Sequence, residues 1–449
     1  MMEMRKVKKH HRRSSSSSSV ISYYENSDVH KRRRRTATAI DDLPIDLVLE
    51  ILHRLDLKSA TRCKSVSKEW CSVITDPFFA RCFVNYNNSR PIVDHRPFTL
   101  LLQCTNWRTK NGHLLLPLEK EPYFKSLPFI PPMYQEQRHN EFNIQASCHD
   151  LFLCSESAVV SDHNTPFFYY VINPITRQWT ALPPLPHQYT ASVVRRWRPR
   201  IGFICNSGDI LLHHHQLQLS FRVMLIPEFE GMSTEFKVYI FSSDTSKWSE
   251  SLVSCPAPEG FELASFAFPA VPYNGLLFWC SRDGSLFGFD PYNSGCYRFI
   301  QKPLELNTSF DNGRLGVSHG ALRISQISYH FSLPFLRVWE FKDKGEEGGK
   351  WCLEHRLFVN ELVLEKSPWF TKNIVKRNYP VVMVLAFHPN DRDIMYLVIH
   401  FKVVSCNLRR KTLEVVRELP DPQCFSLGNN VFNFVLPCWP TPIHSSPFL

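Results

Sequence analysis

The sequence has few glycines, no long apolar run and none of the common nucleotide-binding or hydrolase motifs. It contains 16 glycines against 32 prolines, and neither a P-loop nor a G-x-S-x-G nucleophile motif is present. The longest uninterrupted apolar segment, Val381 to Phe387, is far shorter than the ~20 residues that cross a bilayer. These absences argue against long helices, Gly-rich phosphate loops, a membrane-spanning helix and intrinsic catalysis. We therefore expect a non-enzymatic protein without a cofactor.

The cysteines and histidines also lack a recognisable disulfide or metal pattern. The 14 cysteines are scattered without a C-x-x-C pair, and several, such as Cys205, Cys280 and Cys406, stand in apolar stretches as small hydrophobes. The three adjacent histidines at 213–215 would point to alternate faces of a strand, so they cannot all bind one ion. Because the N-terminus shows no secretory signal, we expect an intracellular protein with reduced cysteines and no metal, in the nucleus, the cytoplasm or both.

The net charge of +10 is concentrated at the N-terminus. Residues 1–39 hold eleven Lys and Arg against three acidic residues, which is +8 and leaves +2 for the rest of the chain. This segment includes a six-serine run and little apolar material, and we expect it to be disordered. Its cluster from Lys31 to Arg35 fits a nuclear import signal, and a solvated basic tail is the alternative. The near-neutral remainder argues against a nucleic-acid-binding surface on the folded part.

Residues 40–84 carry the signals of three short helices. Pro44 suits the first turn of a helix that runs to Leu55. Further helices are predicted over 59–65 and 67–74, and the last one should end before Pro77.

The first of these helices has more apolar surface than one core requires. At about 100° per residue, its apolar side chains cover an arc of about 200°, whereas a helix that lies on a single core needs about 100°. The excess predicts that a partner protein covers one face. The alternative is that the downstream part of the same chain covers it.

The same residues resemble the F-box motif. The matching segments are LPIDLVLEILHRL at 43–55, VSKEW at 66–70 and DPF at 76–78. The resemblance implies that residues 40–84 bind a Skp-type adaptor and, through it, a cullin–RING ligase. It assigns the following residues to the adaptor-facing surface: Leu43, Pro44, Leu47, Ile51 and Leu52. It assigns the following residues to packing inside the three-helix unit: Leu55, Val66, Trp70 and Ile74.

From about residue 95 the sequence changes to short β-type runs separated by turn residues. Four segments at 170–179, 239–248, 287–297 and 404–415 each read as a strand, a polar turn and a return strand. Two such hairpins per unit would make four strands.

Aromatic residues recur at the end of these units with the spacing of propeller blades. Trp179, Trp248, Tyr297 and Trp351 follow one another at intervals of 69, 49 and 54 residues. We predict an α+β multidomain chain, with the helical unit followed by a linker at 85–94 and a mainly antiparallel β-propeller at 95–449. A large β-sandwich is the alternative. The β region also resembles the F-box-associated, kelch-like domains of plant F-box proteins, although it lacks the paired glycines of kelch blades.

One basic-aromatic cluster stands out in the folded part. Its residues are Arg195, Arg196, Trp197, Arg198 and Arg200. Guanidinium groups beside an indole could bind a phosphorylated or acidic segment of a target protein. The alternative is an exposed, solvated loop.

The resemblance implies a substrate-recognition subunit of an SCF-type (Skp–cullin–F-box) E3 ubiquitin ligase. The F-box would hold the adaptor, and the β region would hold a protein destined for ubiquitination and degradation. Two other functions stay open, namely a non-catalytic nuclear or nucleic-acid-associated regulator that acts through the basic tail, and an enzymatic propeller.

Overall fold

The structure, a computed structural model, describes residues 43–88, 97–105, 113–117, 141–157, 168–185, 200–206, 220–226, 235–254, 269–281, 283–293, 295–306, 313–330, 333–343, 348–364, 382–419, 430–437, 439–441 and 443. The basic tail, with the Lys31 to Arg35 cluster, and the histidines at 213–215 lie outside these residues. No helix among the described residues is long and apolar enough to cross a membrane.

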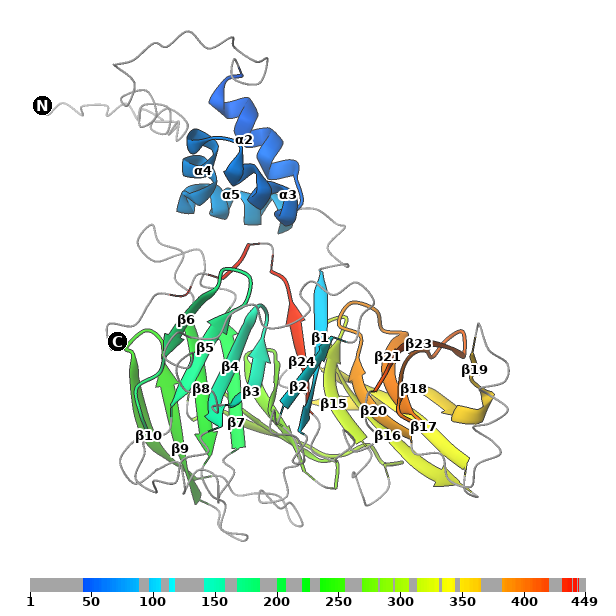
Figure 1. The fold of residues 1–449 in the computed structure, drawn as a ribbon. Coiled ribbons are helices and arrows are strands. Elements are labelled where there is room, and N and C mark those ends of the chain that lie inside the picture. Colours follow the sequence, from blue (N-terminus) through cyan, green and yellow to red (C-terminus); the bar gives the residue numbers. More distant parts are fainter. Residues whose placement is uncertain are drawn as a thin grey trace, which may run out of the picture. The chain divides into compact units, whose positions relative to one another are not determined.

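The helical part contains four α-helices among the described residues (Figure 1). These are α2 (Ile45–Arg54), α3 (Leu57–Arg62), α4 (Lys68–Thr75) and α5 (Pro77–Asn88), with a 3-10 turn at Cys63–Ser65 between α3 and α4. The three predicted helices correspond to α2, to α3 with the 3-10 turn, and to α4. The fourth helix, α5, was not predicted, and it occupies the first residues of the segment that was expected to be a linker.

Side-chain caps explain where α3, α4 and α5 begin. Asp56 Oδ1 accepts a hydrogen bond from the Ser59 amide at 3.0 Å, and Ser67 Oγ accepts one from the Trp70 amide at 3.1 Å. Asp76 Oδ1 accepts a hydrogen bond from the Phe78 amide at 2.7 Å. Each bond satisfies an amide that the first turn of a helix leaves without an intrahelical partner.

The β region consists of six sheets among the described residues. The first two contain β2 (His113–Pro117), β1 (Phe98–Thr105) and β24 (Asn430–Val435), and then β3 (Glu141–Cys148), β4 (Leu151–Ser157), β5 (Tyr169–Asn173) and β6 (Gln178–Ala181). The next two contain β7 (Arg200–Asn206), β8 (Ser220–Ile226), β9 (Glu235–Ser242) and β10 (Lys247–Ser254), and then β11 (Val271–Tyr273), β12 (Leu276–Cys280), β13 (Leu286–Phe289) and β14 (Tyr297–Ile300).

The last two sheets complete the set. One contains β15 (Gly313–Ser318), β16 (Ala321–His330), β17 (Leu333–Asp343) and β18 (Gly349–Phe358). The other contains β20 (Val382–Phe387), β21 (Ile394–Ile399), β22 (Lys402–Asn407) and β23 (Thr412–Glu418), and the short β19 (Val363–Leu364) joins its outer edge in parallel with β23. Thus five sheets have four or five described strands, and the sheet of β2, β1 and β24 has three.

The apolar core shows that these sheets form a closed ring. Six clusters of buried side chains each join two sheets that follow one another, from β1–β24 with β3–β6 around to β20–β23 with β1–β24. A sandwich would have one continuous core between two sheets, whereas a ring of cores between successive sheets is the arrangement of a propeller. The propeller prediction is confirmed, and the sandwich alternative is excluded.

The ring is closed by strands from opposite ends of the β region. β24 lies beside β1 (Figure 1) and pairs with it in antiparallel orientation. In this pairing Phe98 lies opposite Val435. Beyond β24, the Thr441 amide donates to Asp150 Oδ2 at 2.8 Å and the Thr441 hydroxyl donates to Asp150 Oδ1 at 2.6 Å. Thr441 is therefore anchored to the turn between β3 and β4.

The four predicted hairpins are confirmed, and they occupy the same place in their sheets. They are β5–β6, β9–β10, β13–β14 and β22–β23, which are the third and fourth strands of their units. The markers Trp179, Trp248, Tyr297 and Trp351 all lie on fourth strands. The spacing of these aromatic residues therefore reflects the length of the repeating four-stranded unit.

Candidate functional site

Helix α2 exposes apolar side chains on one side while it buries others. The helix follows Pro44, whose carbonyl oxygen accepts hydrogen bonds from the amides of Leu47 and Val48 at 3.0 and 3.2 Å. Leu47 is 46% exposed and Ile51 is 47% exposed. Val48 and Leu52, each one position further along, are 5% and 0% exposed. Since one position turns the helix by about 100°, α2 has a buried apolar stripe and a second apolar stripe beside it that is accessible.

The structure exposes some of the five residues that were assigned to the adaptor-facing surface and buries another. Pro44, Leu47 and Ile51 are exposed, and Leu43 is half-buried. Leu52 is completely buried, which corrects its assignment to that surface. On a helical wheel of α2, apolar side chains cover more than half of the circumference. Such a pattern cannot show which stripe packs inside, and this explains the wrong assignment of Leu52.

The residues assigned to internal packing also differ in how deeply they are buried. Ile74 is completely buried, and Leu55 and Trp70 are half-buried. Val66 is 61% exposed, which corrects its assignment to the interior. It lies at the end of the 3-10 turn, where its amide donates to the Cys63 carbonyl at 3.1 Å, and not on a helix with a buried face.

Helix α5 contributes core and surface residues that the sequence analysis missed. Phe79 and Phe83 are 1% and 2% exposed, and the Phe79 ring stacks on His53 with 4.7 Å between ring centroids. Burial lowers the pKa of His53, although a hydrogen bond to the backbone of Phe79 acts against it. Phe78, on the same helix, is 41% exposed. The signal that could have located α5 is Asp76-Pro77, because an acceptor followed by proline is a helix start.

The proposed basic-aromatic binding cluster falls mostly outside the described residues. These undescribed members are Arg195, Arg196, Trp197 and Arg198. Arg200 is half-buried and begins β7, where it lies opposite Ile226 of β8. No group of three or more His, Cys, Asp or Glu that could hold a metal occurs in the described part of the chain.

A cavity of about 460 Å³ lies among strands of the six described sheets. It is bordered by residues of β1, β24, β3, β7, β11, β15 and β20, so that every sheet contributes to its wall. The wall is mainly apolar. The polar groups include Arg314, whose Nε donates to the Leu385 carbonyl at 2.8 Å and whose pKa is lowered to about 10 by burial. A volume of this size is typical of a site for a small ligand or a side chain of a partner.

Comparisons with known proteins identify both parts of the chain. The F-box domain profile matches residues 40–81, and the profile described as "F-box protein At3g26010-like, beta-propeller" matches residues 120–439. The F-box protein At3g26010 of Arabidopsis thaliana is 26% identical over 80% of this chain and 75% of its own length. At3g23950, another Arabidopsis thaliana protein with F-box in its name, is 28% identical over 85% of this chain and 86% of its own length.

Proposed function

We propose, from the premise that this chain belongs to the At3g26010-like F-box proteins, that it is the substrate-recognition subunit of an SCF-type E3 ubiquitin ligase. In this role the F-box binds a Skp-type adaptor that connects the chain to a cullin–RING ligase. The propeller binds the protein to be ubiquitinated. The chain itself acts without catalysis and without a cofactor.

The observation that carries the proposal is the accessible apolar stripe of α2. Covering a Leu or Ile side chain completely contributes about 1.5–3 kcal/mol to association. Leu47 and Ile51 still expose nearly half of their area, so an adaptor that covers both would gain about 2 kcal/mol from these two residues alone. Pro44 and the half-buried Leu43 directly precede α2 and add apolar surface at its N-terminal end.

Bivalent binding explains how a non-catalytic subunit of this kind would promote ubiquitin transfer. One part holds the ligase and the other holds the target, which raises the concentration of each near the other. The propeller suits the second task because rigid sheets are a typical support for the binding surfaces of proteins. The Arg195 to Arg200 segment is our candidate for target contact, through guanidinium groups that can bind phosphate or carboxylate.

Two affinity purifications test this division of labour. We compare the intact chain with a Leu47→Glu/Ile51→Glu variant, both from cells in which the proteasome is inhibited. The variant should lose the Skp-type adaptor and the cullin while it keeps the proteins bound by the propeller. Leu252→Glu is the matched control, because Leu252 is a 62% exposed leucine on β10 of the propeller. Adaptor recovery that is equal in the intact chain and the α2 variant would contradict the proposal.

We also propose that the Lys31 to Arg35 cluster directs nuclear import. Its support is the density of positive charge, five consecutive Lys and Arg residues. Replacing these residues with alanine should move a fluorescently tagged chain from the nucleus to the cytoplasm. An unchanged distribution would favour a solvated tail without a targeting role.

A further inference from the structure

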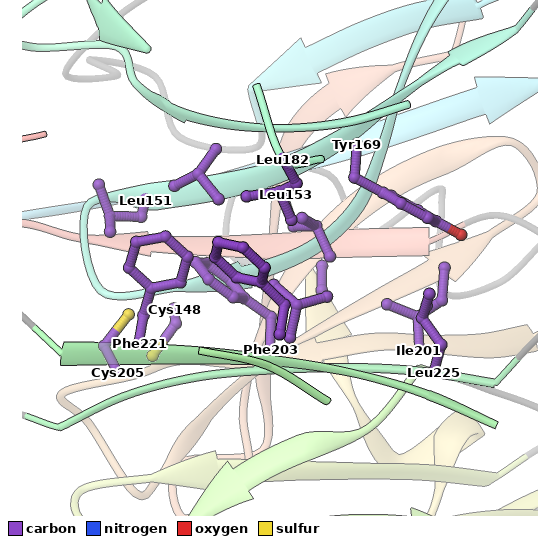
Figure 2. Close-up of a cluster of buried hydrophobic side chains, with 14 of the residues drawn as sticks. Cys148, Leu151, Leu153, Tyr169, Leu182, Ile201, Phe203, Cys205, Phe221 and Leu225 are labelled. Atoms are coloured by element: carbon purple, nitrogen blue, oxygen red, sulfur yellow. The ribbon is translucent and has the colours of Figure 1, made fainter. Parts of the chain in front are cut away.

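Two cysteines from neighbouring sheets face each other in the core of the propeller. Cys148 is the last residue of β3 and Cys205 is the penultimate residue of β7. Both belong to the apolar cluster between these two sheets, with exposures of 5% and 7%. Figure 2 shows their sulfur atoms near the ring of Phe221, and each thiol affects the pKa of the other.

The pair differs chemically from the other buried cysteines. The hydrogen bond from Cys205 lowers the pKa of the Cys148 thiol to about 6, although burial acts in the opposite direction, and the nearby His149 lowers it further. Burial raises the pKa of Cys205, and so do the hydrogen bond and the charge of Cys148. Cys154 and Cys280 have pKa values that burial raises well above the ordinary value. A thiol with a lowered pKa attacks an oxidant more readily, and a second thiol close to it can resolve the oxidised form.

A small oxidant has space beside the pair. Cys148 and Cys205 both border the central cavity of about 460 Å³. A water molecule occupies ~30 Å³ in the liquid, so a molecule as small as hydrogen peroxide fits there with its solvent. Cys280 borders the same cavity, but its sulfur contacts the Ser281 carbonyl at 3.4 Å.

We propose that Cys148 and Cys205 are a redox pair that peroxide converts into a disulfide between the sheets of β3–β6 and β7–β10. The Cys148 thiolate attacks one peroxide oxygen, which breaks the O–O bond and gives a sulfenic acid and hydroxide. The Cys205 thiol then attacks the sulfenic sulfur, its proton leaves with the departing hydroxyl as water, and the S–S bond forms. In total, two thiols and one peroxide give one disulfide and two waters.

The disulfide would change how firmly the propeller is held. It would join two sheets that otherwise contact each other mainly through apolar side chains, and it would close a long loop of chain. Such a crosslink restricts the unfolded state, so we expect the melting temperature of the oxidised chain to rise by about 5 °C. Disulfides in reducing compartments are typically reversible and regulatory, which fits an intracellular sensor.

Peptide mapping of the purified full chain tests the proposal. The reduced chain is treated with hydrogen peroxide, free thiols are blocked with an alkylating reagent, and the digest is analysed by mass spectrometry with and without reductant. We expect a reductant-sensitive peptide pair that joins Cys148 to Cys205. Cys280→Ser is the matched control, because it removes a buried thiol from the same cavity wall and should leave the crosslink intact.

A second variant separates the two steps. In Cys205→Ser the reaction should stop at the sulfenic acid of Cys148, which a dimedone probe captures, and the rise in melting temperature should disappear. If this variant fails to fold, peptide mapping of the unmutated chain still tests the proposed disulfide. Recovery of both cysteines as free thiols after peroxide, or a crosslink between other cysteines in their place, would overturn the proposal.

Discussion

At the scale of single residues, the propeller depends on a few polar groups that are buried together with their partners. Arg323 is completely buried, and its Nη2 and Nε donate to Glu340 Oε2 at 2.5 and 3.0 Å. Arg392 and Lys342 also donate to the Glu340 carboxylate. A buried carboxylate is tolerated only when such partners replace its lost hydration, so removing one member leaves an uncompensated charge.

The charge on Glu340 predicts a pH-dependent stability. Burial acts to raise the pKa of Glu340, but hydrogen bonds from Lys342, Arg323 and Arg392 outweigh it and lower the pKa to about 2. A lowered carboxyl pKa stabilises the fold above the ordinary value of 4.5, and this stability is lost as the pH falls towards 2. Glu340→Gln should therefore lower the free energy of unfolding by about 3 kcal/mol near neutral pH.

Urea unfolding of both chains, near neutral pH and at about pH 3, checks this prediction. The difference in the free energy of unfolding between the two chains should be smaller at the lower pH. There the stabilisation that comes from the lowered pKa of Glu340 is partly lost. Glu250→Gln is the control. Glu250 pairs with Lys237 at 2.8 Å on the surface, with side-chain exposures of 44% and 58%, and its loss should change stability little at either pH. A gap that is constant with pH would contradict the assigned pKa.

At the scale of elements, the outer strands use tryptophan to join one sheet to the preceding one. Trp248 Nε1 on β10 donates to the Pro183 carbonyl at 2.8 Å, just after β6. Trp351 Nε1 on β18 donates to the Gln301 carbonyl at 2.8 Å, just after β14. The same contact thus recurs in two sheets, which gives two of the four aromatic markers, Trp248 and Trp351, a structural reason.

We expect Trp248→Phe to cost about 1 kcal/mol of unfolding free energy. Phenylalanine keeps much of the ring packing on Phe241, whose centroid lies 5.5 Å from that of Trp248, but it cannot donate to Pro183. Denaturant unfolding measures the change. A Trp248→Phe chain as stable as the original would show that the indole hydrogen bond contributes nothing.

Local signals were the part of the fold that the sequence could predict. The turns Asn274-Gly275 and His319-Gly320 have positive φ at both residues, as two-residue hairpin turns require, and a glycine after a polar residue indicates such turns. Helix α5 was missed because Pro77 was interpreted as an end, although the same residue begins a helix when an acceptor such as Asp76 precedes it.

The faces of α2 show a different limit of sequence analysis. Leu47 and Leu52 are both aliphatic, but one is exposed and the other is completely buried. The choice between them depends on which tertiary contacts form. A wheel drawn from the sequence contains no information about those contacts.

At the scale of the whole molecule, closure of the ring is a long-range event that no local pattern indicates. β1 and β24 pair across more than three hundred residues. Asp150 then binds both the Thr441 hydroxyl and the Asn173 side chain, so the segment after β24 is fixed from a second direction. The repeat could be predicted from its spacing, whereas the partner of the first strand could not.

Deleting residues 430–449 should therefore open the propeller. The deletion removes β24 and the Thr441 anchor, which exposes apolar residues of β1 such as Leu101 and Leu102. We expect a lower melting temperature, a broader transition and increased binding of the dye ANS. A shortened chain that still unfolds in one sharp transition at the original temperature would show that closure by β24 is dispensable.

The central claim is that the accessible stripe of α2 docks a Skp-type adaptor, and the dissociation constant of that complex tests it most directly. Isothermal titration compares the full chain, its Leu47→Glu/Ile51→Glu variant and its Leu252→Glu control with one purified adaptor. The account predicts that the α2 variant weakens binding by at least about 100-fold, since lost apolar burial adds to the cost of burying two carboxylates. It predicts no change for the control. Equal dissociation constants for all three chains would contradict it.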